Sequence, residues 1–518
     1  MFDFVETSGG RIPIFPVKGK APVVTKLPPS LILPLCRKKS KYGVGSMNND
    51  RGKAECVENY TKRQEVYRRL QGLEQERRRV HTPEELEALE REIRGYTDQL
   101  GALLLEMHLQ ASLDCEEHQK KEEGLVRSWP GRLKSDGYER VRIFTLGGVW
   151  ITVRARYYCR ACDRRSGKRH KGVYGGLVLL GIHEHCTPGL AATVSAWSAL
   201  LSSFAEVQQV LVEQGVKLDV KGVRRVAYRY AERARVVQQA GQISLAEGDT
   251  VQGRRVVVSA DGGRLRLREN KRGAKTKKGR TRYRGAWREP KLLIIYVVDA
   301  RGKLEKSFAP LIDGHLQGPE ALFQLLEGYL HSLAIDRADH VLFVADGAHW
   351  LWNRIPKLIG ALGLEPQRVH LLIDFYHATE HLGKLAALRK NWSAQQRQAW
   401  IRTQRRRLWT GHVDKVVEAI QSFCRGRNSK AMRTERDYFV GNRQRMAYQT
   451  VRALKLPIGS GAIESAIRRV VNLRLKGACI FWSKDNAEKI LMLRAFYKAG
   501  RWDLLKQMAN SPLSLVIA

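Results

Sequence analysis

The chain has 518 residues, and its 91 Lys and Arg against 52 Asp and Glu give a formal net charge of +39. This length exceeds the size at which a single hydrophobic core stops growing, so we expect several domains. The charge is far larger than solubility requires and makes nucleic acid the expected partner. No apolar run approaches the roughly 18 residues of a membrane-spanning helix and no signal-peptide pattern begins the chain, so the sequence argues against a membrane protein and favours a cytoplasmic, nucleoid-associated one.

The N-terminal region is predicted to contain an arm and then helices. Residues 1–50 are expected to be a disordered basic arm, because six of the 16 prolines lie within the first 46 residues and no hydrophobic period is sustained there. Residues 51–112 are predicted to form a helical hairpin or coiled coil. Thr82 is a suitable N-cap, Pro83 fits the first helical position and Glu85 completes a capping box, so a helix is expected to begin there.

The apolar residues of that second helix repeat in steps of three and four over three heptads, which is the pattern of a coiled-coil seam. The partner of the seam is either the preceding helix, folded back as a hairpin, or a second protomer. We favour a hairpin that also contributes to dimerisation. The seam residues are Leu86, Leu89, Ile93, Tyr96, Leu100, Leu103 and Met107.

Residues 113–182 are predicted to form a zinc-ribbon-like β segment. Eight cysteines in so long a chain do not make a disulfide framework, which directs attention to metal binding. Cys115 with His118, and Cys159 with Cys162, are two pairs of soft ligands that together can complete a structural zinc site. The alternative is that Cys115 and His118 share a helical surface by chance. The rival zinc ligands are His183, His185 and Cys186.

Residues 183–250 are predicted to form a helix-turn-helix-like DNA-binding domain. Three helical stretches follow Thr187-Pro188, and a Gly turn separates the last two. A three-helix bundle with a solvated basic face is the alternative, but the net charge of the chain favours DNA binding. The candidate DNA-binding residues of the last helix are Arg224, Arg225 and Arg229.

Three apolar runs of the second half end on an aspartate: "VVVSADGG" on Asp261, "HVLFVADG" on Asp346 and "VHLLIDFYH" on Asp374. A lone Asp-Gly after a strand is usually a turn. Three such strand ends, however, indicate one shared site.

A basic block follows Asp261. Between Arg264 and Lys291 there are 13 Lys or Arg and two acids, with Tyr283 and Trp287 interleaved, so this region is electropositive and able to stack on bases. Asp261 is therefore either neutralised by an arginine or a ligand of a divalent metal beside a phosphodiester. The candidate DNA-binding residues of the block are Lys271, Arg272, Lys275, Lys277, Lys278, Arg280, Arg282 and Arg284.

A third acid is found in "LPIGSGAIES", where Glu464 lies in the first turn of a predicted helix. Two Mg²⁺ ions, or Mn²⁺ in their place, held by shared carboxylates can activate a nucleophile and stabilise the leaving oxygen, and such a site needs this third acid. Arg468 and Lys476 beyond it are candidate DNA contacts. The alternative is that Glu464 only complements the helix dipole.

Residues from about Arg254 to Arg494 resemble DDE transposases of bacterial insertion sequences, most closely the Kra-type and Lre-type groups related to Mutator-like transposases. The resemblance rests on "SADGG", "WREPK" leading into "LLIIYVV", "VADGAHWLW", "DFYHATEHL" and "GSGAIES…RLKG…W", which occur in the expected order. It implies a catalytic triad of Asp261, Asp346 and Glu464 on an RNase H-like core. Asp374 and His377 match a supporting motif of the family. The upstream zinc pattern is also similar, although His118 stands where a second Cys is usual.

The predicted fold class is therefore α/β, with an RNase H-like core formed by residues 251–378 and a closing helix in residues 457–500. An all-α insertion domain at residues 379–456 interrupts the core, and residues 501–518 are expected to be a C-terminal tail. Trp392, Trp400 and Trp409, spaced as on helices, are expected to be the core of the insertion and not stacking platforms.

The predicted function is that of a DDE transposase. It binds the terminal inverted repeats of an insertion sequence in double-stranded DNA, cleaves at the element ends and joins the 3′-hydroxyl to target DNA, as a homodimer or higher oligomer. The alternatives are an inactive DNA-binding derivative that acts as a repressor, or a structure-selective nuclease with the same fold.

Overall fold

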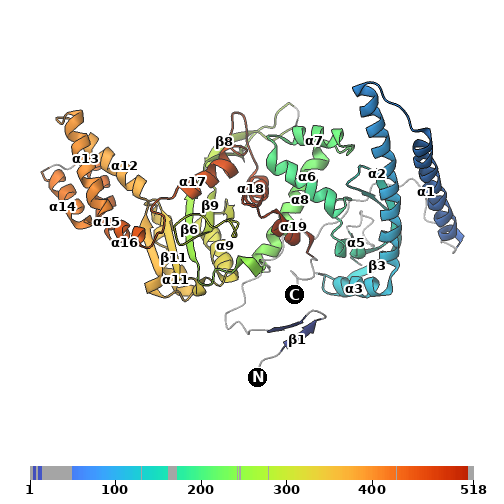
Figure 1. Ribbon diagram of the computed structural model, residues 1–518, viewed down its shortest axis with the longest axis horizontal. Helices are drawn as coiled ribbons and strands as arrows, with labels where there is room; N and C mark the ends of the chain where they lie inside the picture. The colour runs from blue at the N-terminus through green and yellow to red at the C-terminus, as the bar shows by residue number, and fades with distance from the viewer. Residues whose placement is uncertain are drawn as a thin grey trace. The chain divides into compact units, whose positions relative to one another are not determined.

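The computed structural model describes residues 4–7, 10–13, 50–129, 131–160, 172–241, 243, 245, 247–277, 279–426 and 429–511 (Figure 1). The chain divides into two compact units, residues 1–33 and 34–518. In the first unit, β1 (Phe4–Thr7) and β2 (Gly10–Pro13) form an antiparallel hairpin. This hairpin was not expected within the arm at residues 1–50, although Ser8-Gly9 between two short β-forming runs is a hairpin signal. The rest of the arm up to residue 49 lies outside the described residues.

Helix α1 (Asp50–Glu76) contacts helix α2 (Pro83–Asp114), as the hairpin alternative requires. Thr82 accepts a hydrogen bond from the backbone N–H of Glu85 at 3.2 Å, so α2 begins where its cap predicts. The carboxylate of Glu85 accepts from the N–H of His81 and not from that of Thr82, so the expected capping box is shifted by one residue. Leu86, Ile93 and Met107 of the predicted seam are exposed, so the hairpin leaves part of the seam uncovered.

A three-stranded antiparallel sheet packs against α2. Its strands are β3 (Leu133–Phe144), β4 (Trp150–Arg160) and β5 (Gly172–Tyr174), in that order. Every second residue of β4 from Ile151 to Tyr157 is buried, and these side chains share a core with Leu109 and Leu113 of α2. Helices α3 (Glu116–Arg127) and α5 (Gly175–Leu179) contact each other beside this sheet.

Helices α6 (Pro188–Leu200), α7 (Phe204–Glu213) and α8 (Val220–Gln239) begin at the side-chain caps Thr187, Ser203 and Asp219. Helix α8 contacts α18 (Lys484–Lys498) and α19 (Trp502–Asn510), so these helices join the main core instead of packing only on one another. The prediction of a tail at residues 501–518 is wrong for residues 502–510, because Leu504, Leu505 and Met508 give α19 an apolar face that is buried. Residues 512–518 lie outside the described part of the chain.

The central sheet has five strands in the order β10 (Leu311–His315), β9 (Lys291–Val298), β6 (Arg255–Gly262), β11 (His340–Ala345) and β12 (Val369–Ile373). The pairs β10–β9 and β9–β6 are antiparallel, whereas β6–β11 and β11–β12 are parallel. All eight residues of β9 are buried, as expected of a strand covered on both faces. The prediction of a mixed α/β fold is confirmed.

Several helices surround this sheet. Helix α9 (Pro319–Ser332) contacts β9 and β10, and α17 (Gly461–Ile467) contacts β6 and β9. The short helices α10 (His349–Trp352) and α11 (Ile355–Ala361) follow β11, and a π-helical turn (Arg468–Asn472) continues α17. Among the described residues, no helix is long and apolar enough to cross a membrane.

The chain between β12 and α17 is helical where it is described. Its helices are α12 (Phe375–Ala387), α13 (Ala394–Trp409), α14 (Val413–Cys424), α15 (Lys430–Asn442) and α16 (Tyr448–Ala453). Trp392 and Trp400 pack against Phe423 with ring centroids 5.3 and 5.1 Å away, as core residues should. Trp409 differs from this expectation, because its ring is partly exposed while it contacts Phe375.

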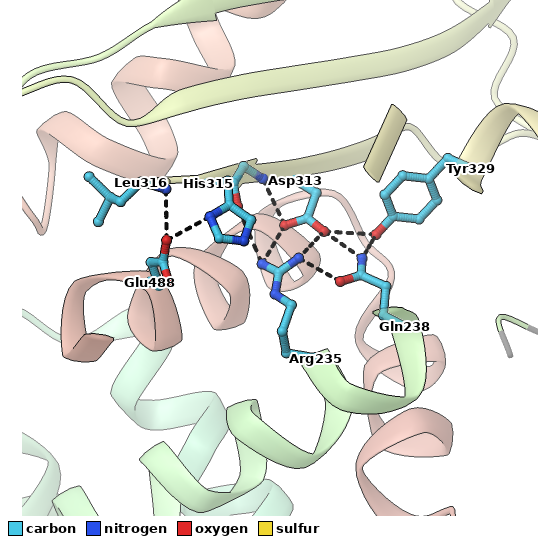
Figure 2. Close-up of polar contacts among 8 residues, drawn as sticks. Arg235, Gln238, Asp313, His315, Leu316, Tyr329 and Glu488 are labelled. Carbon is cyan, nitrogen blue, oxygen red and sulfur yellow. Dashed lines mark hydrogen bonds and ion pairs between the residues drawn. The ribbon is translucent and has the colours of Figure 1, made fainter. Parts of the chain in front are cut away.

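A buried polar network ties α8 to the edge strand β10 (Figure 2). Arg235 donates from both terminal nitrogens to the two carboxylate oxygens of Asp313 at 2.9 Å, and the hydroxyl of Tyr329 donates to the same carboxylate. Burial alone would raise the pKa of Asp313, but the Arg235 charge and hydrogen bonds from Arg235, Gln238 and the N–H of Gly314 lower it below its ordinary value. On the same strand, His315 pairs with Glu488 of α18 at 2.6 Å. Helix α8 is therefore held to the sheet by charge as well as by apolar packing.

Candidate active site

The sheet brings the three predicted aspartates to one edge. Strands β6, β11 and β12 run parallel, so their carboxyl ends lie together. Asp261 is the penultimate residue of β6, Asp346 directly follows β11 and Asp374 directly follows β12. Ligands of α/β sheets commonly bind at this end of the strands.

Asp261 is half-buried, and its carboxylate accepts a hydrogen bond from the N–H of Gly262 at 2.6 Å. Its pKa is raised to about 6, chiefly by burial and then by the negative charges of Asp346 and Glu289, against the opposing effect of Gly262 and His377. A neighbouring arginine would lower this pKa. The alternative that an arginine neutralises Asp261 is therefore disfavoured.

Asp346 is held by the start of α10. One of its carboxylate oxygens accepts from the N–H of Ala348 at 3.0 Å, and its backbone carbonyl accepts from the indole N–H of Trp352 at 2.6 Å. These bonds fix the direction in which the chain leaves β11.

Asp374 is almost completely buried and acts as a clamp between two helices. One carboxylate oxygen accepts from the N–H groups of Tyr376 and His377, which caps α12. The other accepts from both the N–H and the hydroxyl of Ser460, the residue before α17. Because both oxygens already accept two bonds, Asp374 is suited to position its neighbours.

His377 of α12 and Glu464 of α17 approach each other next to Asp374. The Nε2 atom of His377 lies 3.6 Å from a carboxylate oxygen of Glu464, and the Ser460 hydroxyl lies 3.5 Å from the same oxygen. His377 also faces Glu380 at 3.6 Å through Nδ1. The Glu464 side chain is 56% exposed, so it is free to change rotamer.

The acids are near one another but do not form a compact cluster. Asp261 interacts with Asp346 and His377, and His377 with Glu464. Within the described part of the chain, no group of three or more His, Cys, Asp or Glu side chains is placed to hold a metal ion. The acids therefore lie along one edge of the sheet, the acidic edge, and His377 interacts with Asp261 on one side and with Glu464 on the other.

Two residues near this edge were missed by the sequence analysis. Glu289 pairs with Lys291 at 2.6 Å, and a Cβ on Gly262 would overlap its carboxylate. The ring of Tyr438 approaches Gly347 so closely that a Cβ there would lie 2.5 Å away. Burial, with Asp346 and Asp374, raises the pKa of Tyr438. Glu289 lies in "WREPK" and so had a motif signal, whereas Tyr438 had none.

The basic block forms a two-stranded ribbon that extends from the central sheet. Strands β7 (Leu265–Asn270) and β8 (Tyr283–Arg288) are antiparallel, and Leu265 pairs with Arg288 just beyond the β6–β9 pair Gly262 and Lys291. The ribbon therefore begins next to Asp261. The described candidate DNA contacts, all exposed, are Lys271, Arg272, Lys275, Lys277, Arg280, Arg282 and Arg284, whereas Lys278 lies outside the described residues.

The remaining candidate DNA contacts differ in accessibility. Arg468 and Lys476 are exposed beyond α17, and Arg224 is exposed on α8. Arg225 and Arg229 both pair with Glu184, at 2.7 and 3.3 Å.

Other arginines of α8 do not face solvent. Arg233 is buried and donates to the backbone carbonyls of Ala509 and Ser511, and Arg235 pairs with Asp313. Burial and the charge of Arg229 lower the pKa of Arg233 to about 9. Fewer arginines of α8 are therefore available to DNA than its sequence indicates, because Arg233 and Arg235 hold the helix to the core.

The predicted zinc ligands are not assembled where they are described. Cys115 is exposed at the start of α3, His118 lies 3.1 Å from the carbonyl of Gly176, and Cys159 is buried on β4. Cys162 lies outside the described residues. The zinc site stays a prediction.

The rival ligands also have other surroundings. His185 lies 3.0 Å from the carbonyl of Arg142 through Nδ1, and burial raises the pKa of Cys186 to about 12. His183 is half-buried, and its pKa is lowered well below the ordinary value, chiefly by burial. These three residues offer no better-defined zinc site than the predicted one.

Comparison with known proteins adds one finding. No protein-family model and no curated protein matches the chain. Among solved structures, the chain is similar to the Drosophila P element transposase strand transfer complex, with 10% sequence identity and a TM-score of 0.23, over 64% of this chain and 83% of that chain. A TM-score this low does not establish a shared fold.

Proposed function

We propose that the chain is a DDE-type DNA transposase. It binds the terminal inverted repeats of an insertion sequence, cleaves DNA at the element ends and joins the released 3′-hydroxyl to target DNA. The observation that carries the proposal is a chain of neighbours at one edge of the mixed sheet, in which Asp261 interacts with Asp346 and His377, and His377 lies 3.6 Å from Glu464. The order of antiparallel and parallel strands supports an RNase H-like core.

The acidic edge offers carboxylates of the kind that divalent metal ions prefer, and Glu464 would have to move to complete a group of three that could hold them. Asp261 is half-buried beside another carboxylate and has a raised pKa, so a cation there would relieve both burial cost and repulsion. Asp261, Asp346 and Glu464 would hold two Mg²⁺ or Mn²⁺ ions. Once bound, such ions activate the attacking oxygen and stabilise the leaving oxygen.

The other residues of the edge position this set. Asp374 fixes the starts of α12 and α17 relative to each other and so places His377 beside Glu464. Glu464 must turn away from His377 to join the two aspartates, which its exposed side chain permits. His377 would then be available to contact the DNA backbone or the attacking oxygen.

The ribbon and α8 supply the DNA contacts. The exposed Lys and Arg of β7–β8 and its connecting loop, with Arg468 and Lys476, can neutralise phosphates of bound DNA. Arg224 and Arg225 would contribute from α8.

We also propose that the chain acts as a homodimer or higher oligomer through the exposed part of the α2 seam. A structural zinc ion is proposed to be bound by Cys115, His118, Cys159 and Cys162.

The test is incubation of the purified protein with labelled element ends and Mg²⁺. The proposal expects nicks at the element boundary followed by products in which the 3′-end is joined to a second DNA. Binding without cleavage would favour the repressor alternative. Cleavage of a branched DNA, offered as a second labelled substrate, without joining of either DNA would favour the structure-selective nuclease.

A further inference from the structure

The ribbon carries two large aromatic side chains in solvent. Tyr283 and Trp287 lie four residues apart on β8 and therefore on the same face, and they are 43% and 48% exposed. Arg266 pairs with Trp287 across the ribbon, and its guanidinium lies 5.3 Å from the centre of the indole ring. The guanidinium of Arg268, whose partner across the ribbon is Gly285, lies 4.9 Å from the centre of the Tyr283 ring. The face thus alternates aromatic rings with cations.

A third ring completes this face. Gly285 lies between Tyr283 and Trp287, and a Cβ there would lie 2.5 Å from the ring of Phe481. Phe481 contacts Tyr283 edge-on at 5.8 Å and lies under the guanidinium of Arg266 at 4.7 Å. We call this surface the aromatic face. It consists of Trp287, Phe481 and Tyr283 in a row, with Arg266 and Arg268.

The opposite face of the ribbon holds it in place. Leu265 and Leu267 point away from the aromatic face and are buried. The edge of β7 is paired with Trp482, which donates its N–H to Arg266 and accepts from Arg268 at 3.0 and 2.8 Å. The ribbon is therefore fixed both to β6, which carries Asp261, and to the segment that follows the Glu464 helix. The aromatic face is anchored rather than free to collapse onto the core.

We propose that the aromatic face binds unpaired nucleobases of the DNA strand beside the cleavage site. The inference rests on the proposed function and names the form of its substrate: DNA whose bases are unstacked next to the scissile phosphate. Phosphate binding needs only Lys and Arg, and an intact duplex offers no base faces to an aromatic ring. Aromatic rings interleaved with arginines are the arrangement that holds single strands by stacking. The 13 basic residues and two acids of the block favour this occupant over a second copy of the same positively charged chain.

The experiment measures binding of two fluorescent DNAs by the full chain in EDTA, a single-stranded dT 20-mer and a 20-base-pair duplex. Trp287→Ala should weaken single-strand binding roughly 10-fold, within the range measured for loss of one stacked base. Duplex binding and the salt dependence of both should stay near wild type, because no charge is lost. Trp287→Phe should retain most of the single-strand affinity.

Trp150→Ala is the matched control. Trp150 lies on β4, is 44% exposed and lies under the guanidinium of Arg142 at 4.8 Å, but it belongs to a different sheet. The control should bind both DNAs like wild type. Equal losses for single strand and duplex with Trp287→Ala, or no loss, would overturn the inference and leave the proposed function standing. A wild-type protein that binds neither DNA would overturn both.

Discussion

Asp261 and Asp346 end adjacent parallel strands, and the charge of Asp346 adds to burial in raising the pKa of Asp261 to about 6. The folded protein therefore binds a proton at Asp261 more tightly than the unfolded chain does, for which the ordinary value is 3.8. The stability that this proton provides is complete below about pH 4 and is lost as the pH rises through about 6. At neutral pH without metal, the edge stores electrostatic strain.

The first prediction follows from that strain. At pH 7 in EDTA, Asp261→Asn should melt no lower than wild type, with a gain of at most about 3 kcal/mol, the equivalent of two pKa units. At pH 4 the difference should vanish, because wild-type Asp261 is then protonated. Thermal melts at both pH values check this. A variant that is destabilised at pH 7 would show that the carboxylate is needed for folding.

The second prediction concerns the bond between α8 and the sheet. Asp313→Ala leaves the Arg235 charge buried without its carboxylate, which should cost about 3–5 kcal/mol and lower the melting temperature. Arg225→Gln is the control, because Arg225 is exposed and its partner Glu184 keeps a second pair with Arg229, so its loss should cost about 1 kcal/mol or less. Equal, small effects of both changes would mean that α8 is held by apolar packing alone.

The third prediction concerns phosphate contacts. Neutralising four exposed basic residues of the ribbon and its loop should weaken binding to every DNA sequence alike and lower the salt slope by about 0.9 per lost contact. Neutralising Lys120 and Lys121, which pair with Glu116 and Glu117 on α3, should leave the slope unchanged. The four neutralising substitutions of the ribbon and its loop are Lys275→Gln, Lys277→Gln, Arg280→Gln and Arg282→Gln. If they weakened binding only to the terminal repeat, the ribbon would contact bases in a sequence-specific way.

The fourth prediction tests the zinc site. Metal analysis should find about one zinc per chain, and Cys115→Ala should remove it. Cys115 is exposed, so its replacement does not disturb a core, and the exposed Cys479 provides a control that should keep the metal when changed to Ala. Full zinc occupancy in Cys115→Ala would exclude Cys115 as a ligand.

The strand ends were predictable from sequence because Asp261, Asp346 and Asp374 each follow a continuous apolar run. Such runs are buried on both sides, and parallel strands bring their carboxyl ends to one edge. The partners of α8 were not predictable. A helical period does not reveal that Arg233 meets the chain near Ala509, or that Arg235 meets Asp313, because both contacts join segments far apart in sequence.

The same limit explains the other differences. The segment at residues 502–510 was expected to belong to a tail, yet its apolar face packs on α8. Tyr438 was missed because only the close approach at Gly347 brings α15 to Asp346. The positions of the aspartates at strand ends could be predicted from the local sequence, whereas the residues around them depend on tertiary contacts.

The most direct measurement of the central claim is cleavage and joining of labelled element ends by Asp261→Asn, Asp346→Asn and Glu464→Gln in Mg²⁺, with Glu380→Gln as the control that also faces His377. Each triad variant should bind element ends within about 3-fold of wild type and lose both reactions by about 100-fold or more, because both depend on the same two ions. The control should stay active. An Asp261→Asn protein that cuts element ends at near wild-type rate would contradict the account.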